Sequence, residues 1–168
     1  MGAAVTNDAP LELWRETVRP EWIDQNGHMN VAYYVLIFDH AVDALFSHVG
    51  LDPDYRTRTT GSTFTVESHI TFDRELVAGK VARCTAQLIG FDEKRIHHYY
   101  EMYDAAAGTL AATTEFMSLH MDMATRRVAP MPEDIQRRLG ELMHTHAGLP
   151  RPANLGRVIK VPGQPAGG

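Results

Sequence analysis

A short polar segment, Asp24 to Asn30, carries the side chains best suited to chemistry in this chain. It brings a carboxylate, an imidazole, a glycine and several amides together, and an apolar run, Val31 to Phe38, follows at once. If that run is helical, its first backbone N–H groups are free to bind a carbonyl oxygen or an anion, and the helix dipole adds to their attraction. The segment therefore predicts a site at a helix N-terminus.

Each of these side chains also has an ordinary structural explanation. Asp24 could close an Asx turn, the favoured interpretation on spacing alone, or act as nucleophile or general base on a thioester. Asn30 is a good helix-capping type, and Gly27 would allow a positive φ or a close ligand approach. His28 would orient water or bind a substrate carbonyl, or simply satisfy a backbone carbonyl. Only the cluster as a whole favours a site.

Composition limits the class of protein. The chain has 168 residues, of which 44% are hydrophobic and 22% charged, as expected for one globular domain. A net charge of -5 gives nucleic-acid binding no support. Cys84 is the only cysteine, which excludes an intramolecular disulfide, favours a reducing compartment and suggests a buried thiol. We find no signal peptide and no run long enough to cross a bilayer, so a soluble cytoplasmic protein is expected.

The elements that must position the polar segment follow from periodicity. We expect a disordered start over residues 1–10, a domain over 11–125, and a C-terminal helix and extended tail over 126–168 that belong to the same domain. A buried helix is predicted over 30–49, and residues 52–61 are predicted to be a loop. The predicted strands cover 11–18, 64–72, 81–91, 95–103 and 109–121, and a second helix covers 133–145.

The order of these elements favours an α+β fold. A strand, an apolar helix and a run of antiparallel strands can bury one another if the sheet wraps around the helix. In the strand over 64–72, Phe64 and every second residue after it should face the helix, with Glu67 and His69 on the other face. That outer face and the sheet edges would then invite a partner subunit.

Other polar and aromatic groups are weaker candidates. No spacing typical of a metal site, a phosphate loop or a nucleophile elbow occurs. His97 and His98 would point to opposite faces of their strand and cannot easily share an ion. Aromatic residues around the polar segment are mostly expected in the core, although two or three of them could hold a quaternary ammonium group. They are Trp22, Tyr33, Tyr34, Phe38 and Phe64.

The motif Asp-x-x-Gly-His-Met-Asn before an apolar helix resembles the 4-hydroxybenzoyl-CoA thioesterase group of hotdog-fold enzymes. In that group an aspartate three residues before a glycine is the catalytic carboxylate, and this position is Asp24 here. The resemblance implies a thioester polarised by backbone N–H groups near Asn30 to Ala32. It also implies an active site shared between subunits of a homodimer or homotetramer, with no metal or organic cofactor.

Three further strings are similar to those of betainyl-CoA thioesterases, a subfamily that releases glycine betaine during carnitine breakdown. They are Phe-Thr-Val-Glu-Ser-His-Ile (64–70), Leu-Ile-Gly-Phe-Asp-Glu-Lys-Arg-Ile-His (88–97) and Leu-Gly-Arg-Val-Ile-Lys-Val-Pro (155–162). This similarity gives Glu67 and the aromatic residues a possible role, because a trimethylammonium group suits an anionic or aromatic pocket.

The resulting hypothesis is a thioesterase acting on a short-chain acyl-CoA, with betainyl-CoA favoured. Asp24 is the expected nucleophile or base, and His28 and Asn30 orient groups. Substrate contacts are expected from Gly27, Val31, Ala32, Trp22, Tyr33, Phe64 and Glu67. Lys94 and Arg95 are expected to bind CoA among several basic residues that could do so. The alternatives are a thioesterase for fatty or aromatic acyl-CoA, an enoyl-thioester hydratase and a non-catalytic acyl-CoA binder.

Overall fold

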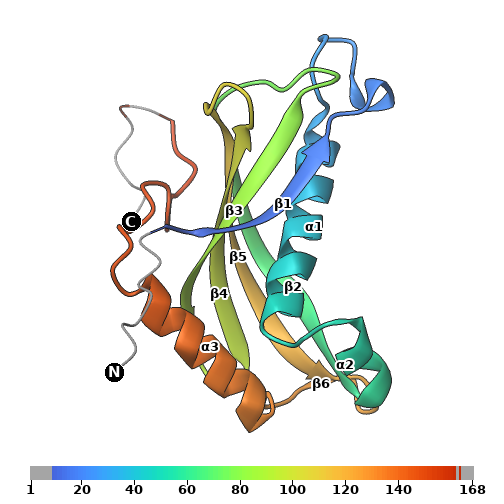
Figure 1. Cartoon of the computed structure of the whole chain (residues 1–168), viewed down its shortest axis with the longest axis vertical. Coiled ribbons are helices and arrows are strands. Elements are labelled where there is room, and N and C mark those ends of the chain that lie inside the picture. The colour runs from blue at the N-terminus through green and yellow to red at the C-terminus, as the bar shows by residue number, and fades with distance from the viewer. Residues whose placement is uncertain (1–8, 162, 164–168) are drawn as a thin grey trace, which may run out of the picture.

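The computed structural model describes residues 9–161 and 163, so most of the expected disordered start, residues 1–8, lies outside it. Ten elements follow one another along the chain (Figure 1). They are β1 Leu11–Thr17, the 3-10 helix η1 Pro20–Trp22, α1 Val31–His48, α2 Pro53–Arg58, β2 Gly61–Phe72, β3 Val81–Phe91, β4 Arg95–Asp104, β5 Leu110–Asp122, β6 Arg127–Val128 and α3 Glu133–His146.

One antiparallel sheet makes up the body of the molecule. Its strand order is β1-β3-β4-β5-β2, with the short β6 paired to β5. The consecutive strands β3, β4 and β5 form the predicted meander, and α1 lies along one side of the sheet (Figure 1). One apolar core joins buried side chains of α1, the sheet and α3, and it includes Cys84. Burial raises the pKa of the Cys84 thiol to about 12, which fits the expected structural role.

Helix α1 begins where the sequence predicts. Asn30 is its N-cap, and its side-chain oxygen accepts a hydrogen bond from the Ala32 N–H. Gly50 follows the helix with φ 91°, a conformation that ends helices at little cost for glycine. The expectation of burial all round is wrong, because Val31 and Val35 are 54% and 42% exposed. A sequence of apolar residues does not distinguish a core face from a face that another subunit covers.

Strand β2 contains a β-bulge that the alternating sequence conceals. Thr65 pairs with Ser118 and Glu67 with Met117, so Val66 is an extra residue in the ladder. The bulge exchanges the two faces of the strand at that point. Phe64 pairs with Leu119 on the face away from α1, contrary to the prediction, whereas Phe72 faces α1 and contacts Tyr34 edge-on. Glu67 lies on the outer face, as predicted.

Two features of the lower half of Figure 1 complete the fold. The predicted loop over 52–61 contains the helix α2, which Asp52 caps by accepting a hydrogen bond from the Tyr55 N–H. Helix α3 packs against β3, where the Leu88 N–H donates to His146 Nδ1 at 2.9 Å. These elements close the end of the sheet remote from the polar segment.

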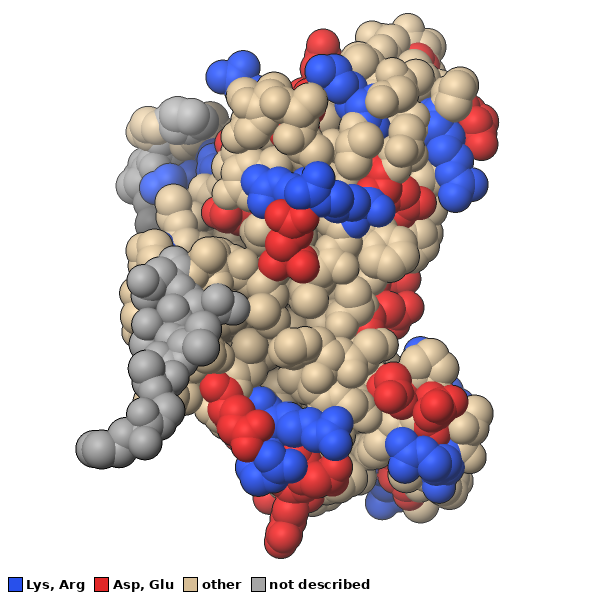
Figure 2. Space-filling model, viewed as in Figure 1, with Lys and Arg blue, Asp and Glu red and all other residues tan. Residues whose placement is uncertain are grey.

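The surface carries mixed charge. On the face shown in Figure 2, Lys and Arg side chains lie beside Asp and Glu, and a broad uncharged band separates the upper and lower charged groups. This face therefore offers no wide basic surface of the kind that nucleic acid requires. None of the described helices combines the length and the apolarity needed to span a membrane.

Candidate active site

The polar segment folds into a tight loop that closes on itself. Ile23 and Met29 form an isolated antiparallel bridge, and the Gly27 N–H donates to the Asp24 carbonyl at 3.0 Å across a β-turn. Asp24 occupies the first position of this turn, where its Oδ1 accepts from the Asn26 N–H at 2.8 Å. Gly27 has φ 82°, as its expected role requires. The Asx-turn interpretation of Asp24 is thus confirmed.

A second group approaches the other carboxylate oxygen. Asn30 Nδ2 lies 3.4 Å from Asp24 Oδ2, at the long limit of a hydrogen bond. Asn30 therefore caps α1 with its oxygen and orients Asp24 with its nitrogen. Because the only contact to Oδ2 among the described residues is this long one, that oxygen retains capacity to accept a proton from, or attack, a substrate group.

Some backbone N–H groups around the start of α1 already donate a hydrogen bond, and others are open, that is, without an acceptor among the described residues. The Asn30 N–H donates to Trp22 O, and the Ala32 N–H is taken by the cap. The N–H groups of His28 and Val31 have no acceptor among the residues the structure describes. An open N–H in the first helical turn, aided by the helix dipole, can stabilise the oxyanion of a reacting carbonyl. Of the N–H groups of Asn30, Val31 and Ala32 that were expected to bind an oxyanion, only that of Val31 is therefore open.

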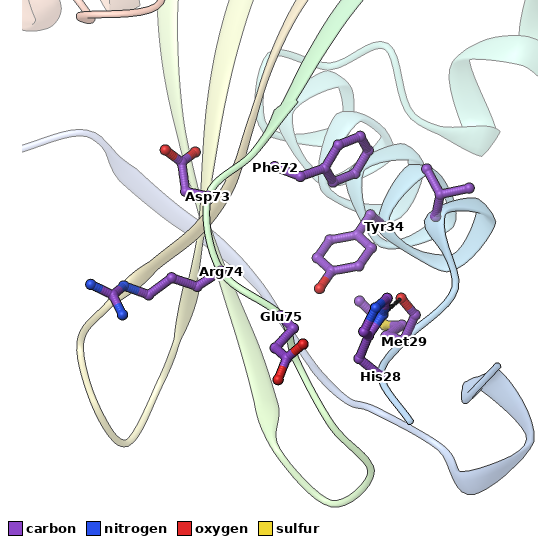
Figure 3. Close-up of a pocket in the computed structure, with 8 residues that line it drawn as sticks. His28, Met29, Tyr34, Phe72, Asp73, Arg74 and Glu75 are labelled. Carbon is purple, nitrogen blue, oxygen red and sulfur yellow. Dashed lines mark hydrogen bonds between the residues drawn. The ribbon is translucent and has the colours of Figure 1, made fainter. Parts of the chain in front are cut away.

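A cavity of about 260 Å³ opens beside this helix start. We call it the α1 cavity, and its walls come from the polar loop, the first turn of α1 and the chain after β2 (Figure 3). Tyr34 and Phe72 lie against one another there, and Tyr34 receives a hydrogen bond from the Leu76 N–H at 2.9 Å. In Figure 3 Arg74 extends away from Tyr34, whereas Glu75 and His28 lie near its hydroxyl end. The lining residues are His28, Met29, Val31, Tyr34, Phe72, Asp73, Arg74 and Glu75.

Comparison with known proteins shows the family to which the chain belongs. A family model described as the thioesterase-like superfamily matches residues 18–139, which span the loop, the helix and the whole sheet after β1. The chain belongs to the thioesterase-like superfamily. The predicted hotdog fold and the predicted class of enzyme, a thioester hydrolase, are thereby confirmed.

Individual relatives agree with this thioesterase assignment. The chain is 38% identical over 152 residues to a Pseudomonas aeruginosa protein named betainyl-CoA thioesterase, a match that covers 90% of this chain and 96% of the relative. It is 37% identical to an L-carnitine dehydrogenase/betainyl-CoA thioesterase of Rhizobium meliloti, over 89% of this chain but 30% of that protein. A hypothetical protein of Staphylococcus aureus, solved in complex with CoA, superposes with a TM-score of 0.83 at 32% identity, covering 96% of this chain and 100% of its own.

The thioesterase structure brings only some of the predicted site residues together. His28 and Val31 line the α1 cavity, whereas Asp24 and Asn30 lie beside it in the same loop without lining it. Trp22 is buried, with Tyr33 stacked on it at 5.0 Å and the Arg19 guanidinium over its ring at 4.9 Å. Trp22 is thus packed against other side chains of the chain itself, which makes it a support for the loop.

The remaining predicted residues lie elsewhere in the subunit. Phe64 and Glu67 are on the outer sheet face, so neither reaches the α1 cavity of its own chain. Lys94 lies in the turn between β3 and β4 and Arg95 begins β4, and they pair with Glu93 and Asp92 respectively. That turn is at the opposite end of β3 from Val81, which pairs with Thr17 just before the polar loop. Contacts from these four residues to substrate therefore remain predictions that require a second subunit.

Sequence reasoning missed the wall formed by residues 72–75. This segment is brought to the loop by the Met29 N–H, which donates to Leu76 O at 2.7 Å, and by the contact between Tyr34 and Phe72. The two parts are more than 40 positions apart, and no local spacing in either one signals the other. The cavity forms only because the end of β2 packs against the start of α1 in the tertiary structure.

Proposed function

We propose that the protein hydrolyses the thioester of a short-chain acyl-CoA, with betainyl-CoA as its favoured substrate. The observation that supports this best is the open Val31 N–H in the first turn of α1, beside a cavity and next to the loop that carries Asp24. This pairs an oxyanion donor with a carboxylate, the two groups that thioester hydrolysis needs.

The chemistry follows from these groups. The thioester oxygen accepts a hydrogen bond from the Val31 N–H, which stabilises the negative charge that develops there. Oδ2 of Asp24 either removes a proton from the attacking water or attacks the carbonyl carbon itself to form an anhydride that water then opens. In both routes the carbon–sulfur bond breaks, CoA leaves as a thiolate that takes up a proton, and the acid is released. Asn30 keeps the carboxylate oriented.

The substitution Asp24→Asn tests this role. An asparagine oxygen can still accept from the Asn26 N–H, so the turn should survive while the base or nucleophile is lost. We expect kcat to fall by about 10²–10⁴-fold with an unchanged melting temperature. Asp54→Asn, at an exposed position of α2 remote from the polar loop, is the matched control and should retain activity. Near-normal turnover of the Asp24→Asn enzyme would remove Asp24 from the mechanism.

The choice of betainyl-CoA is supported by the relatives' names and by the chemistry of the α1 cavity. Tyr34 and Phe72 offer aromatic surface, and Glu75 adds a carboxylate. A trimethylammonium group gains roughly 0.5–2 kcal/mol from each good aromatic contact, and a negative charge nearby adds to this. Glu75 thus takes the part that the sequence suggested for Glu67.

A panel of CoA esters followed by thiol release tests the substrate. Betainyl-CoA should be hydrolysed with a higher kcat/KM than acetyl-CoA or an uncharged isostere such as 3,3-dimethylbutyryl-CoA. Glu75→Gln should lower kcat/KM for betainyl-CoA by about tenfold and leave the uncharged ester little affected. A preference for long-chain or aromatic acyl-CoA would refute this substrate, and loss of enoyl absorbance without thiol release would reveal a hydratase.

The proposal includes a homodimer or homotetramer in the cytoplasm. Support for association comes from β2, a strand at one end of the described sheet that carries the exposed side chains Val66 and Phe72. A partner across that edge could bring its own Glu67, Lys94 and Arg95 closer to the α1 cavity. The reduced, buried thiol of Cys84 suits a reducing compartment.

A further inference from the structure

The segment after α3 crosses the outer face of the sheet and is fixed to it at several points. We call residues 150–161 the strap; it lies on the side of the sheet remote from α1 (Figure 1). Gln87 Nε2 on β3 donates to the Pro150 carbonyl at 3.4 Å. Asn154 Nδ2 donates to Thr71 on β2 at 3.2 Å and to Thr113 on β5 at 3.3 Å. The strap therefore travels from β3 towards the β2 edge.

The strongest of these anchors is Glu115. Its Oε2 accepts from the Gly156 N–H at 2.6 Å, while its Oε1 lies 2.7 Å from His97 Nε2. Both carboxylate oxygens are thus engaged, and the side chain is only 19% exposed. Gly156 has φ 70°, a backbone conformation that glycine adopts without strain. The residues that follow Gly156 are consequently held at a defined place beside β2.

Two basic side chains extend from this fixed point. Arg157 and Lys160 line a groove of about 640 Å³ between the strap and the end of β2. Neither forms an ion pair with a carboxylate of the described chain, and Arg157 makes only a 3.5 Å contact to Asn154 of the strap itself. The groove therefore offers two cations that no acidic group neutralises directly.

The groove and the α1 cavity share a wall. Phe72 lines both, and half of its surface is exposed. An acyl-CoA has its thioester at one end of a long pantetheine arm and its phosphates at the other. With the thioester at the start of α1, the arm can pass Phe72 at the end of β2 and bring the phosphates to the strap.

We infer that Arg157 and Lys160 of the strap bind the phosphates of the CoA moiety. An arginine can hold a phosphate through two parallel hydrogen bonds, and a lysine adds a compact charge. This inference rests on the proposed function. It differs from the expectation for Lys94 and Arg95, which lie at the other end of the sheet in the same subunit and are already paired with acidic neighbours.

The test compares two thioesters that carry the same acyl group. One is the CoA ester, and the other is the N-acetylcysteamine ester, which has no phosphates. For Arg157→Ala/Lys160→Ala we expect KM for the CoA ester to rise about tenfold or more, with little change in kcat. KM for the truncated ester should not change. The salt dependence of KM for the CoA ester should also weaken, because screening acts on the lost charges.

Two controls separate this site from its rivals. Arg137→Ala removes an exposed arginine of α3 and should leave both KM values unchanged. Lys94→Ala/Arg95→Ala tests the sequence-based alternative in the same assay. The inference is overturned if that second double variant carries the effect, if the strap variant changes both KM values equally, or if it changes neither.

Calorimetry with free CoA decides the inference independently of activity. The strap variant should bind CoA about tenfold or more weakly than the unaltered protein. If the unaltered protein hydrolyses neither thioester, the proposed function fails, but weaker CoA binding by the strap variant still supports the phosphate site. Equal CoA binding by the two proteins contradicts it, whatever the enzyme assay shows.

Discussion

At the scale of single residues, the observed structural roles and the proposed chemical roles fall on the same side chains. Asp24 closes a turn with one oxygen and leaves the other available for the proposed chemistry, and Asn30 caps a helix while its amide nitrogen lies beside Asp24. The sequence presented these roles as alternatives, because residue type and spacing suit both. The two roles are compatible, because a carboxylate has two oxygens and an amide has two polar atoms.

The role of the Val31 N–H can be tested by a substitution that removes this hydrogen. Proline is well tolerated at the first position of a helix, and Asn30 has φ -62° and ψ 145°, a conformation suited to the residue before proline. Val31→Pro should therefore fold normally but lose the oxyanion donor, with kcat reduced by about 10²–10³-fold. Val31→Ala retains the N–H and should keep most activity. Equal kcat values for the two variants would exclude this N–H from the mechanism.

At the scale of elements, the helices and strands that show a clear hydrophobic period were predicted from the sequence. The long helix, the meander strands and α3 occur within a few residues of their expected bounds. The bulge at Val66 escaped notice because the alternating pattern continues through it, so Phe64 was assigned to the wrong face. Helix α2 was missed although Asp52 and Pro53 are a capping residue and a first-turn proline, because six residues are too few to show a helical period.

The candidate site was predictable only as far as it is local. The loop and the helix start are contiguous in sequence, and their geometry agrees with the expectation. The α1 cavity depends on residues 72–75, and the strap groove depends on residues 153–160 lying against β2. Such contacts between distant segments depend on strand register and side-chain packing, which cannot be predicted from residue composition and spacing alone.

The strands β4 and β5 also carry a buried imidazole that should make stability depend on pH. His98 has no exposed surface and lies 2.9 Å from both Tyr100 Oη and Ser118 Oγ. Burial, with a smaller contribution from His97, lowers the pKa of His98 to about 3. The histidine pKa in the unfolded chain is about 6.5, so between about pH 6.5 and 3 His98 is protonated in the unfolded chain and neutral in the folded one. Stability should fall as pH drops below about 6.5 towards 3.

Urea unfolding at pH 7 and pH 5 measures this contribution. His98 alone should lower the free energy of unfolding by about 2 kcal/mol between these values. His98→Gln keeps a polar neutral side chain and should be less stable at pH 7, but its loss between pH 7 and pH 5 should be smaller by about that amount. His144→Gln, at an exposed position of α3, is the control and should behave like the unaltered protein. An unchanged pH dependence in His98→Gln would contradict the burial of a neutral imidazole.

At the scale of the whole molecule, exposed apolar surface gathers where the site lies. Val31 and Val35 form one stripe of α1, and Phe72 and Val66 are exposed on β2, whose end contacts the start of α1. Strand β2 is also at one end of the described sheet order, so one of its edges can pair with another chain. A second copy placed there would cover these side chains and contribute to the active site. In the proposed dimer, assembly through this edge would therefore be linked to catalysis.

Association can be weakened by one charge placed in this stripe. Val35→Lys should turn a dimer of the 18.8 kDa chain into monomers and lower activity, since burying an unpaired ammonium group at an interface is costly. Val128→Lys is the matched control: both valines are 42% exposed, but Val128 pairs with Met121 on the opposite side of β5 from β2. Light scattering coupled to size exclusion should show a dimer for this control. If the unaltered protein is a monomer that remains fully active when diluted, this result contradicts both the shared active site and the β2 interface. In that case no partner subunit is present to place its Glu67, Lys94 and Arg95 near the substrate.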